Sequence, residues 1–265
     1  MEKIVTCPIS EKPMEPIFTD TILNKYKVTY YYSSESGLLK TEKPYWLDEA
    51  YNEAISITDT GLVQRNIENS NLLTIILECL SIENGQFLDI GGGYGLLTRL
   101  MRDKGFDCYT TDKYCKNIFA QTFEPRDNFE YNALFAFEIL EHIVDPLEFL
   151  RTIFNQYNCR TIIFSTLTFT HTVPAKDWWY YCFESGQHIT FYQPRTLSLL
   201  ADNLECKYYM INPNLHIITD IAISRINRII LFNKHIRWLY SIYIQKKRKD
   251  LSKTDDDHLK MKKQL

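Results

Sequence analysis

The chain has 265 residues, of which 45% are hydrophobic and 24% are charged, proportions typical of a globular protein rather than a disordered or fibrous one. Its net charge is −3, but residues 225–265 carry 12 Lys and Arg against 4 Asp and Glu, which leaves −11 for residues 1–224. An acidic body argues against a nucleic-acid groove in the main part of the chain, because such grooves need clustered Lys and Arg.

The cysteines and the N-terminal sequence both indicate the cellular compartment of the protein. The seven cysteines are scattered and form no C-x-x-C pair, so reduced thiols are expected rather than a disulfide framework or a zinc ribbon. The first twenty residues contain charged residues and three prolines, which excludes a signal-peptide core. No run of about 18 uncharged apolar residues occurs, so no transmembrane segment is expected. The sequence therefore predicts a cytoplasmic protein.

The first 45 residues are expected to form an irregular lead-in of strands and turns. Three prolines before residue 17 disfavour a helix, and the β-favouring run 26–32 ends at the turn residues 33–37. From residue 45 to residue 80 the pattern becomes helical. Its apolar residues recur at spacings of three and four, as in an amphipathic helix that faces a core.

Strand and helix signals alternate after residue 86. This alternation predicts a doubly wound α/β fold with a mostly parallel sheet. Asp145 and Pro146 are typical of an N-cap and a first helical residue. The turn at 212–214 is too short for a parallel crossover, so the last two strands should be antiparallel. The expected strands are 87–90, 107–111, 131–137, 161–166, 207–211 and 215–219, and the expected helices are 95–104, 117–122, 146–157 and 194–203.

The segment FLDIGGGYG, residues 87–95, is the strongest functional signal. It follows a predicted strand and opens a predicted helix, which is the position of a nucleotide-binding glycine loop. A dinucleotide fingerprint would need a third glycine at position 96, where this sequence has Leu. Asp89 instead adds negative charge at the strand end, which would repel a pyrophosphate and attract a cationic amino-acid group.

A second acid follows at the end of the next strand. Asp112 comes 21 residues after Gly91, where a carboxylate can accept the hydroxyl protons of a ribose. The loop and this acid together fit S-adenosylmethionine, which carries an ammonium, a sulfonium and an adenosine. The alternative is that Asp89 only begins a helix and that Asp112 only forms a turn.

Four segments, FLDIGGGYG, TTDKY, FAFEILEHIVDP and GQHITFY, occur in this order and resemble class I S-adenosylmethionine-dependent methyltransferases. The resemblance covers roughly residues 1–220 and is nearest to a group found among sugar- and glycan-modifying genes. It implies a Rossmann-like sheet of seven strands whose last strand is antiparallel, with S-adenosylmethionine as cofactor. The residues assigned to the cofactor are Asp89, Gly91, Gly92, Gly93, Tyr94, Gly95, Asp112, Lys113, Phe137 and Glu138.

The lead-in of that family often carries two C-x-x-C knuckles that hold zinc. Here Cys7, Ser10, Ser33 and Ser36 occupy what look like the ligand positions. Serine hydroxyls are poor zinc ligands, so we expect no zinc at these positions. The lead-in should persist as a remnant strand hairpin that is packed by its tyrosines.

Transfer of a methyl group to a hydroxyl requires a group that removes the proton. We assign this role to His188, although a structural histidine is an open alternative. Glu141 and His142 complete the assigned catalytic set. With Glu138 they form an E-x-x-E-H run that resembles the metal-binding run of ubiquinone-pathway and small-RNA methyltransferases. A structural role of this run is preferred over metal binding, so no metal ligand is assigned.

Two further segments allow more than one interpretation. Residues 178–181, WWYY, are a candidate lid over the acceptor or a hydrophobic plug under a long loop. Residues 220–245 are expected to be helical. Their apolar seam could dock on its own domain, pair with a second copy or adsorb to an anionic membrane, and we rank these readings in that order. The seam consists of Ile229, Phe232, Ile236, Leu239 and Tyr243.

The sequence thus predicts a lead-in at 1–45, a methyltransferase domain at 46–220 and a basic C-terminal helix and tail at 221–265. The predicted reaction is transfer of a methyl group from S-adenosylmethionine to a small-molecule or glycan-type acceptor, at oxygen. The C-terminal helix is a candidate homodimer contact. The alternatives are a catalytically silent, cofactor-binding assembly subunit and, less favoured, a nucleotide-dependent oxidoreductase or epimerase.

Overall fold

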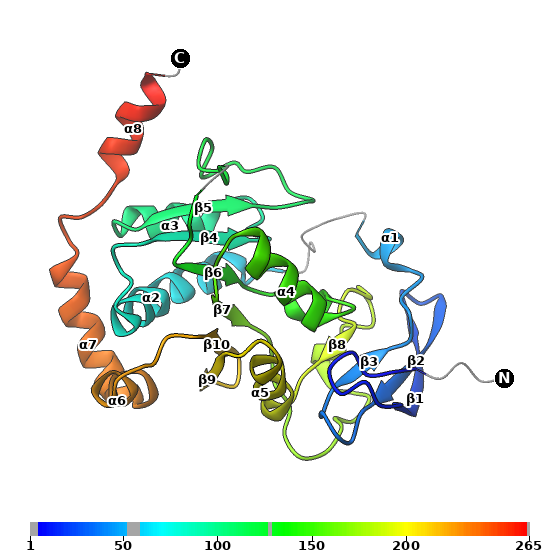
Figure 1. Cartoon of the computed structure of the whole chain (residues 1–265). Helices are drawn as coiled ribbons and strands as arrows, with labels where there is room; N and C mark the ends of the chain where they lie inside the picture. The colour runs from blue at the N-terminus through cyan, green and yellow to red at the C-terminus, as the bar shows by residue number, and fades with distance from the viewer. Residues whose placement is uncertain (1–4, 52–58, 127–128, 264–265) are drawn as a thin grey trace. The chain divides into compact units, whose positions relative to one another are not determined.

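The structure is a computed structural model that describes residues 5–51, 59–126 and 129–263 (Figure 1). The chain divides into two compact units. The first unit comprises Met1–Ser56, Phe137–Gln156 and Ile163–Asp220, and the second unit comprises Ile57–Ala136, Tyr157–Ile162 and Ile221–Leu265.

The larger sheet has six strands, hydrogen-bonded in the order β5-β4-β6-β7-β10-β9. Strand β4 pairs in parallel with β5 and β6, and β9 pairs with β10 in antiparallel fashion. The α/β class and the antiparallel last pair are therefore confirmed, whereas the sheet of the described residues has six strands and not seven. The bounds are β4 (Gln86–Ile90), β5 (Asp107–Thr111), β6 (Ala133–Ala136), β7 (Thr161–Ser165), β9 (Lys207–Asn212) and β10 (Leu215–Thr219).

In the second unit, α3 contacts β5, and α2 contacts α3, α6 and α7. Leu73, Leu77 and Leu80 form part of the buried side of α2, as their spacing predicts. Gly105 has a φ of +87° just after α3, so the expected glycine stop is confirmed. The helices are α2 (Leu62–Leu80), α3 (Leu96–Asp103), α6 (Arg225–Phe232), α7 (Lys234–Lys247) and α8 (Thr254–Lys262).

The first unit contains a second, antiparallel sheet in the order β1-β2-β3-β8. Tyr30 is fully buried on β2 and stacks on Phe18 of β1, with ring centroids 4.6 Å apart. The indole of Trp46 donates to the carbonyl of Gly186 at 2.8 Å. The bounds are β1 (Glu15–Ile22), β2 (Tyr26–Tyr32), β3 (Leu39–Thr41), α1 (Leu47–Ala50), η1 (Leu140–His142), α4 (Pro146–Gln156), η2 (Trp179–Tyr181), β8 (Thr190–Phe191) and α5 (Pro194–Asn203).

Three expectations about helices need correction or qualification. The helix expected at 117–122 is wrong, because the side chain of Asn117 bonds both the amide and the carbonyl of Ala120 and closes a turn instead. The helical stretch expected at 45–80 appears as α1 and α2, while 52–58 lie outside the described residues. The single C-terminal helix is divided at Asn233, whose side chain accepts from the amides of His235 and Ile236 and caps α7.

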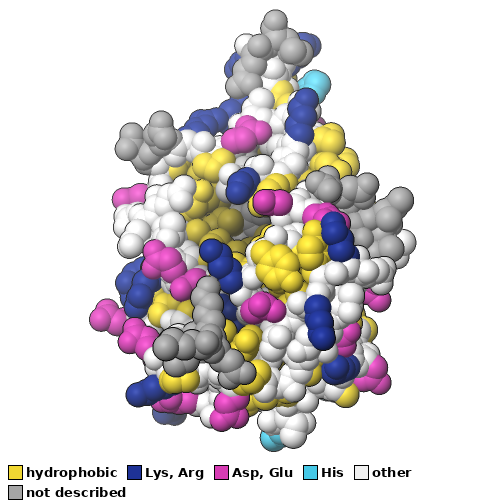
Figure 2. All heavy atoms as spheres, turned by 90° about the vertical axis from the view of Figure 1, so that its right-hand side faces the viewer, with side chains coloured by type: hydrophobic (Ala, Val, Ile, Leu, Met, Phe, Trp, Pro, Cys, Tyr) yellow, Lys and Arg dark blue, Asp and Glu magenta, His cyan; other side chains and the backbone are white. Residues whose placement is uncertain are grey.

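Three further features concern the helices, the cysteines and the surface. No helix of the described residues combines the length and the apolar character needed to cross a bilayer. All seven cysteines are free thiols, as expected. On the face shown in Figure 2, Lys and Arg side chains are interspersed with Asp and Glu, and hydrophobic side chains lie among them.

Candidate active site

The glycine loop joins β4 to α3 in the second unit, and its backbone requires glycine. A Cβ atom on Gly92 would lie 2.2 Å from Oγ1 of Thr110 and 2.5 Å from Oδ2 of Asp89. Gly95 begins α3 with a φ of +82°, a conformation that other residues rarely adopt. The loop therefore approaches the ends of β4 and β5 more closely than any side chain would allow.

Asp112 lies against this loop. Its Oδ2 accepts a hydrogen bond from the amide of Gly93 at 2.9 Å, and its Oδ1 accepts from the amides of Tyr114 and Cys115 at 2.7 Å each. A carboxylate has about four acceptor directions, so this one retains capacity for further hydroxyl donors. The structure thus brings together the loop and the second acid of the predicted cofactor site.

Asp89 lies beneath the loop and is only 2% exposed. Its Oδ2 has no hydrogen-bond partner among the described residues. Burial and, to a smaller degree, the charge of Asp112 raise the pKa of Asp89 to about 8. A cation nearby would favour the ionised form of such a carboxyl group, so Asp89 fits a positively charged ligand.

The other residues assigned to the cofactor lie around the loop or after β6. The side chains of Tyr94 and Lys113 are exposed, and the Lys113 ammonium is 5.2 Å from the ring centroid of Tyr114. In the first unit, Phe137 and Glu138 form a turn and are half-buried.

Glu138 has a backbone conformation that is unusual for a residue with a side chain, with a φ of +55°. Its amide donates to Oγ of Ser165 at 2.7 Å, and the Ser165 hydroxyl donates back to Oε1 of Glu138 at 2.5 Å. These reciprocal hydrogen bonds hold the strained turn. Strained residues that the surroundings hold in place are typical of functional sites.

His142 and His188, which are 46 positions apart in the chain, lie side by side in the first unit. Their ring centroids are 5.0 Å apart at an interplanar angle of 81°. Nδ1 of His142 is 3.0 Å from the carbonyl oxygen of Gln187, and Nδ1 of His188 is 2.8 Å from the carbonyl oxygen of Tyr180. Because a carbonyl oxygen only accepts, each Nδ1 carries a proton.

Both imidazoles are neutral near pH 7. Burial and the neighbouring His188 lower the pKa of His142 to about 3. Burial also lowers the pKa of His188, against the opposing influence of the Tyr180 carbonyl and Glu138. With the proton on Nδ1, the lone pair of each neutral ring is on Nε2, where it can accept a proton or bind a metal ion.

Glu141 is the third member of this cluster and is fully buried. Its Oε1 accepts from the hydroxyl of Tyr180 at 2.8 Å, whereas its Oε2 has no hydrogen-bond partner among the described residues. Burial and the neighbouring Glu138 raise the pKa of Glu141 to about 8. The carboxyl group is therefore largely protonated at neutral pH.

The cluster also has the composition of a metal site. Glu141, His142 and His188 each offer one ligand atom, and these atoms all lie within 4.8 Å of one another. Hydrogen bonds that hold the other ring nitrogen are the usual support of a metal-binding histidine. The unpartnered oxygen of Glu141 would gain a partner from a cation, so the residues fit a divalent ion.

The aromatic residues 178–181 mainly form a plug. Tyr180 and Tyr181 are buried in the core of the first unit, with Trp178 packed against them. Only Trp179 remains available to an acceptor, with 72% of its surface exposed. The plug interpretation thus fits Tyr180 and Tyr181, and of these four residues only Trp179 stays a candidate for contact with an acceptor.

Sequence reasoning did not identify two polar residues of the site. Tyr180 belongs to the aromatic run that predicts a lid or a plug, but its carbonyl oxygen and its hydroxyl contact His188 and Glu141. Ser165, the partner of Glu138, is not among the predicted site residues. It lies at the carboxyl end of β7, a position that could have indicated it, because functional side chains of α/β sheets gather at that end.

Comparison with known proteins identifies the family. A family described as a methyltransferase domain matches residues 64–209, more than half of the chain. No curated protein matches the sequence.

Solved structures that resemble the chain include the methyltransferase domain of bacterial CtHen1-C, with 16% identity, a TM-score of 0.41 and coverage of 59% of this chain and 99% of that one. Mitomycin 7-O-methyltransferase MmcR has 10% identity and a TM-score of 0.46, with 68% and 61% covered. Human N-acetylserotonin methyltransferase in complex with SAM has 12% identity and a TM-score of 0.40, with 67% and 66% covered. The chain spans less than two thirds of the length of the last two.

The family match includes the glycine loop, both acids beside it and the segments that carry both histidines. The chain therefore belongs to the methyltransferase-domain family, and it is an S-adenosylmethionine-dependent methyltransferase.

Proposed function

We propose that the protein methylates a hydroxyl oxygen of a small-molecule or glycan-type acceptor and that His188 removes the hydroxyl proton. The observation that carries the proposal is the hydrogen bond between His188 and the backbone of Tyr180. Its Nδ1 is held by the Tyr180 carbonyl at 2.8 Å, and its lowered pKa keeps Nε2 unprotonated at neutral pH. A neutral imidazole in this tautomer is a suitable general base.

The surrounding residues keep this base in place. S-adenosylmethionine, when bound, supplies a methyl group on a positively charged sulfur. Nε2 of His188 accepts the proton that the acceptor hydroxyl loses. Tyr180 positions the ring through its carbonyl oxygen, and the Tyr180 hydroxyl is in turn held by Glu141. In the second unit, Gly93 and Asp112 are the residues proposed to bind the cofactor.

A metal-assisted form of the same reaction is the second candidate. It is favoured by Oε2 of Glu141, which is buried without a partner among the described residues. A divalent ion would be held by this oxygen and by Nε2 of His142 and of His188, and it would lower the pKa of an acceptor hydroxyl. Activity that is lost on chelation and restored by Mg²⁺ or Mn²⁺ supports this form, and activity that survives chelation excludes it.

The glycan-type acceptor is supported by the lead-in. Sγ of Cys7 is 3.2 Å from Oγ of Ser36, and the amide of Ser36 donates to Oγ of Ser33 at 3.2 Å. Hydrogen bonds thus join residues at three of the four positions that resemble zinc ligands in the glycan-modifying group. We propose that the lead-in is a knuckle region that has lost its metal.

Mass spectrometry of a panel of nucleotide sugars and oligosaccharides, incubated with S-adenosylmethionine, tests the proposal. Wild type should add one methyl group to at least one acceptor, and His188→Gln should lower kcat by 10²- to 10⁴-fold, the usual contribution of a general base. His258→Gln, an exposed histidine on α8, is the matched control and should remain active. Full activity of His188→Gln would exclude the base, and cofactor binding without any transfer would favour the silent subunit.

A further inference from the structure

Helix α7 turns its apolar side away from the protein. At about 3.6 residues per turn, five apolar residues fall on one side of the helix, and the buried Ile244 and Arg248 fall on the other. A helix that docks on its own domain has the opposite arrangement. The exposed residues are Ile236 (36%), Trp238 (63%), Leu239 (60%), Ile242 (51%) and Tyr243 (59%).

Helix α6 repeats this arrangement. Ile226, Ile229 and Phe232 are 72%, 56% and 43% exposed. On the opposite side, Leu231 is fully buried and the amide group of Asn227 donates to the carbonyl of Cys79 at 2.7 Å. The seam predicted from the sequence therefore lies on the surface, and the reading in which it docks on its own domain is wrong.

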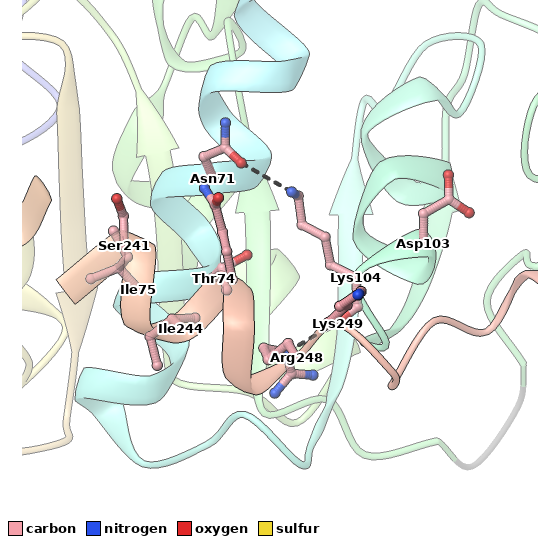
Figure 3. Close-up of a pocket in the computed structure, with 10 residues that line it drawn as sticks. Asn71, Thr74, Ile75, Asp103, Lys104, Ser241, Ile244, Arg248 and Lys249 are labelled. Atoms are coloured by element: carbon pink, nitrogen blue, oxygen red, sulfur yellow. Dashed lines mark hydrogen bonds between the residues drawn. The ribbon is translucent and has the colours of Figure 1, made fainter. Parts of the chain in front are cut away.

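Polar contacts fix the orientation of α7 within the second unit. The ammonium of Lys247 lies 2.7 Å from Oε2 of Glu78, and the guanidinium of Arg248 donates to the carbonyl of Lys104 at 3.1 Å. Figure 3 shows Ser241, Ile244 and Arg248 on the side of α7 that faces α2 and α3, where they line a small pocket with Asn71 and Lys104. The outward direction of the apolar side is thus set by packing and is not a consequence of a detached helix.

The charge of these helices indicates what covers the apolar side. Residues 225–249 contain eight Lys and Arg and no Asp or Glu. Arg225, Lys234, Lys246 and Lys249 are exposed. A second copy packed on this face would bring the two sets of positive charges together, whereas an anionic surface would neutralise them. Trp and Tyr, here Trp238 and Tyr243, are the side chains that favour the boundary between lipid and water.

We propose that α6 and α7 adsorb to the surface of a bilayer that contains anionic lipids. The exposed apolar residues enter the boundary between headgroups and acyl chains, and the lysines and arginines contact the lipid phosphates and carboxylates. Apolar burial and charge attraction act together in this mode of binding, which is typical of interfacial amphipathic helices.

Co-sedimentation of the full chain with vesicles tests the proposal. The protein should bind vesicles of phosphatidylcholine with about one third phosphatidylserine, bind pure phosphatidylcholine vesicles at least tenfold more weakly, and dissociate as salt is raised. The fluorescence of Trp238 should shift to shorter wavelength on binding, and Trp238→Phe should abolish most of that shift. Equal binding to both kinds of vesicle, or binding to neither, would overturn the proposal.

Substitutions of exposed residues separate the contribution of apolar burial from that of charge attraction without disturbing the core. Leu239→Glu should lower binding to the anionic vesicles at least tenfold, whereas Val63→Glu, a 57% exposed residue on α2, should not. The double variant Lys246→Glu and Lys249→Glu should also lower binding to the anionic vesicles at least tenfold. The double variant Lys12→Glu and Lys27→Glu, which changes the charge by the same amount, is its control and should bind like wild type. If analytical ultracentrifugation instead shows a lipid-free dimer that Leu239→Glu dissociates, the apolar side is a contact between copies.

Discussion

The carbonyl oxygen of Tyr180 lies 2.8 Å from Nδ1 of His188, so a main-chain atom sets the tautomer of the proposed base. The hydroxyl of the same tyrosine donates to Glu141 and accepts from the amide of Leu167 at 3.0 Å. One buried residue thereby connects the histidine, the carboxyl group and the loop that follows β7.

Tyr180→Phe should show whether the Tyr180 hydroxyl positions the cluster of His188 and Glu141 in addition to stabilising the fold. Loss of the hydroxyl leaves the amide of the half-buried Leu167 without this partner, which should lower the free energy of unfolding by about 1–3 kcal/mol. The variant should also have a roughly tenfold lower kcat with unchanged affinity for the cofactor. Tyr181→Phe is the control, because that hydroxyl is bonded to the carbonyl of Pro174 and not to the cluster. Equal kcat losses in both variants would contradict the role of Tyr180.

Glu141→Gln should change how stability depends on pH. The pKa of Glu141 is about 8 in the folded protein and 4.5 when the group is unperturbed, so between these values the folded state binds the extra proton and stability falls as pH rises. Asp89, with a pKa of about 8, acts in the same direction. Between pH 6.5 and 8, above the titration of His142, each carboxyl should contribute up to about 1.4 kcal/mol per pH unit, and about half of that at pH 8.

Urea unfolding over this pH window, in the presence of a chelator, measures the effect. The amide of Glu141→Gln does not titrate, so the loss of stability with rising pH should be about half of that in wild type. An unchanged slope would show that Glu141 is already ionised in the folded protein.

Asp257→Ala should destabilise the second unit strongly. Oδ2 of Asp257 accepts from Nε of Arg102 at 2.7 Å, Oδ1 accepts from Nη2 at 2.6 Å, and both side chains are buried. Removal of Asp257 leaves the buried guanidinium of Arg102 with only the carboxylate of Asp107, 2.9 Å from Nη1, as an ion-pair partner among the described residues, which should cost about 3 kcal/mol in chemical denaturation. Asp255→Ala, exposed on the same helix, should cost less than about 1 kcal/mol. Similar values for the two variants would contradict a structural role of the ion pair.

Gly92→Ala should abolish cofactor binding. Its Cβ would lie 2.2 Å from Oγ1 of Thr110 and 2.5 Å from Oδ2 of Asp89, so the loop must move. Gly61→Ala is the control, because the nearest atom there is the flexible end of Arg65 at 2.9 Å. Calorimetric titration with S-adenosylmethionine and with its demethylated product should show at least tenfold weaker binding for Gly92→Ala alone. Normal binding would show that the cofactor lies elsewhere.

Restoring the thiols should restore a metal site in the lead-in. The combined changes Ser10→Cys, Ser33→Cys and Ser36→Cys place three cysteines next to Cys7, whose Sγ is already 3.2 Å from Oγ of Ser36. Four thiolates are a suitable tetrahedral zinc site. Elemental analysis should find one additional equivalent of zinc relative to wild type. The variant with Ser36→Cys alone should bind far more weakly, and no gain in the triple variant would refute the knuckle interpretation.

The elements that could be predicted from the sequence are those whose side chains alternate or repeat clearly. Strand β5 and helix α5 lie at the expected positions, and the Asp145 cap of α4 is present, with Oδ1 3.0 Å from the amide of Glu148. Such signals are local, because the spacing of apolar residues within a strand or an amphipathic helix shows which of its sides is buried.

Elements that depend on distant partners could not be predicted. Strand β1 contains Pro16 at an irregular register position, which weakens the strand signal. Helix α8 has no apolar stripe and is held instead by the ion pair between Asp257 and Arg102, which are 155 residues apart. The proximity of His142 and His188 likewise arises from tertiary packing, since no local spacing relates the two residues.

Strand β3 pairs with β8, so that Leu39 lies opposite Phe191 and the amide of Thr41 donates to the carbonyl of Ile189 at 2.9 Å. The residue next to His188 is thus anchored by the beginning of the chain, outside the region that defines the family. During synthesis this pairing must wait until the roughly 150 residues that separate Thr41 from Ile189 have been made, and closing so long a loop is entropically costly and slow. The proposed reaction centre is therefore among the last parts of the protein to form, and a fragment trimmed to residues 64–209 would lack the strand that anchors Ile189 beside His188.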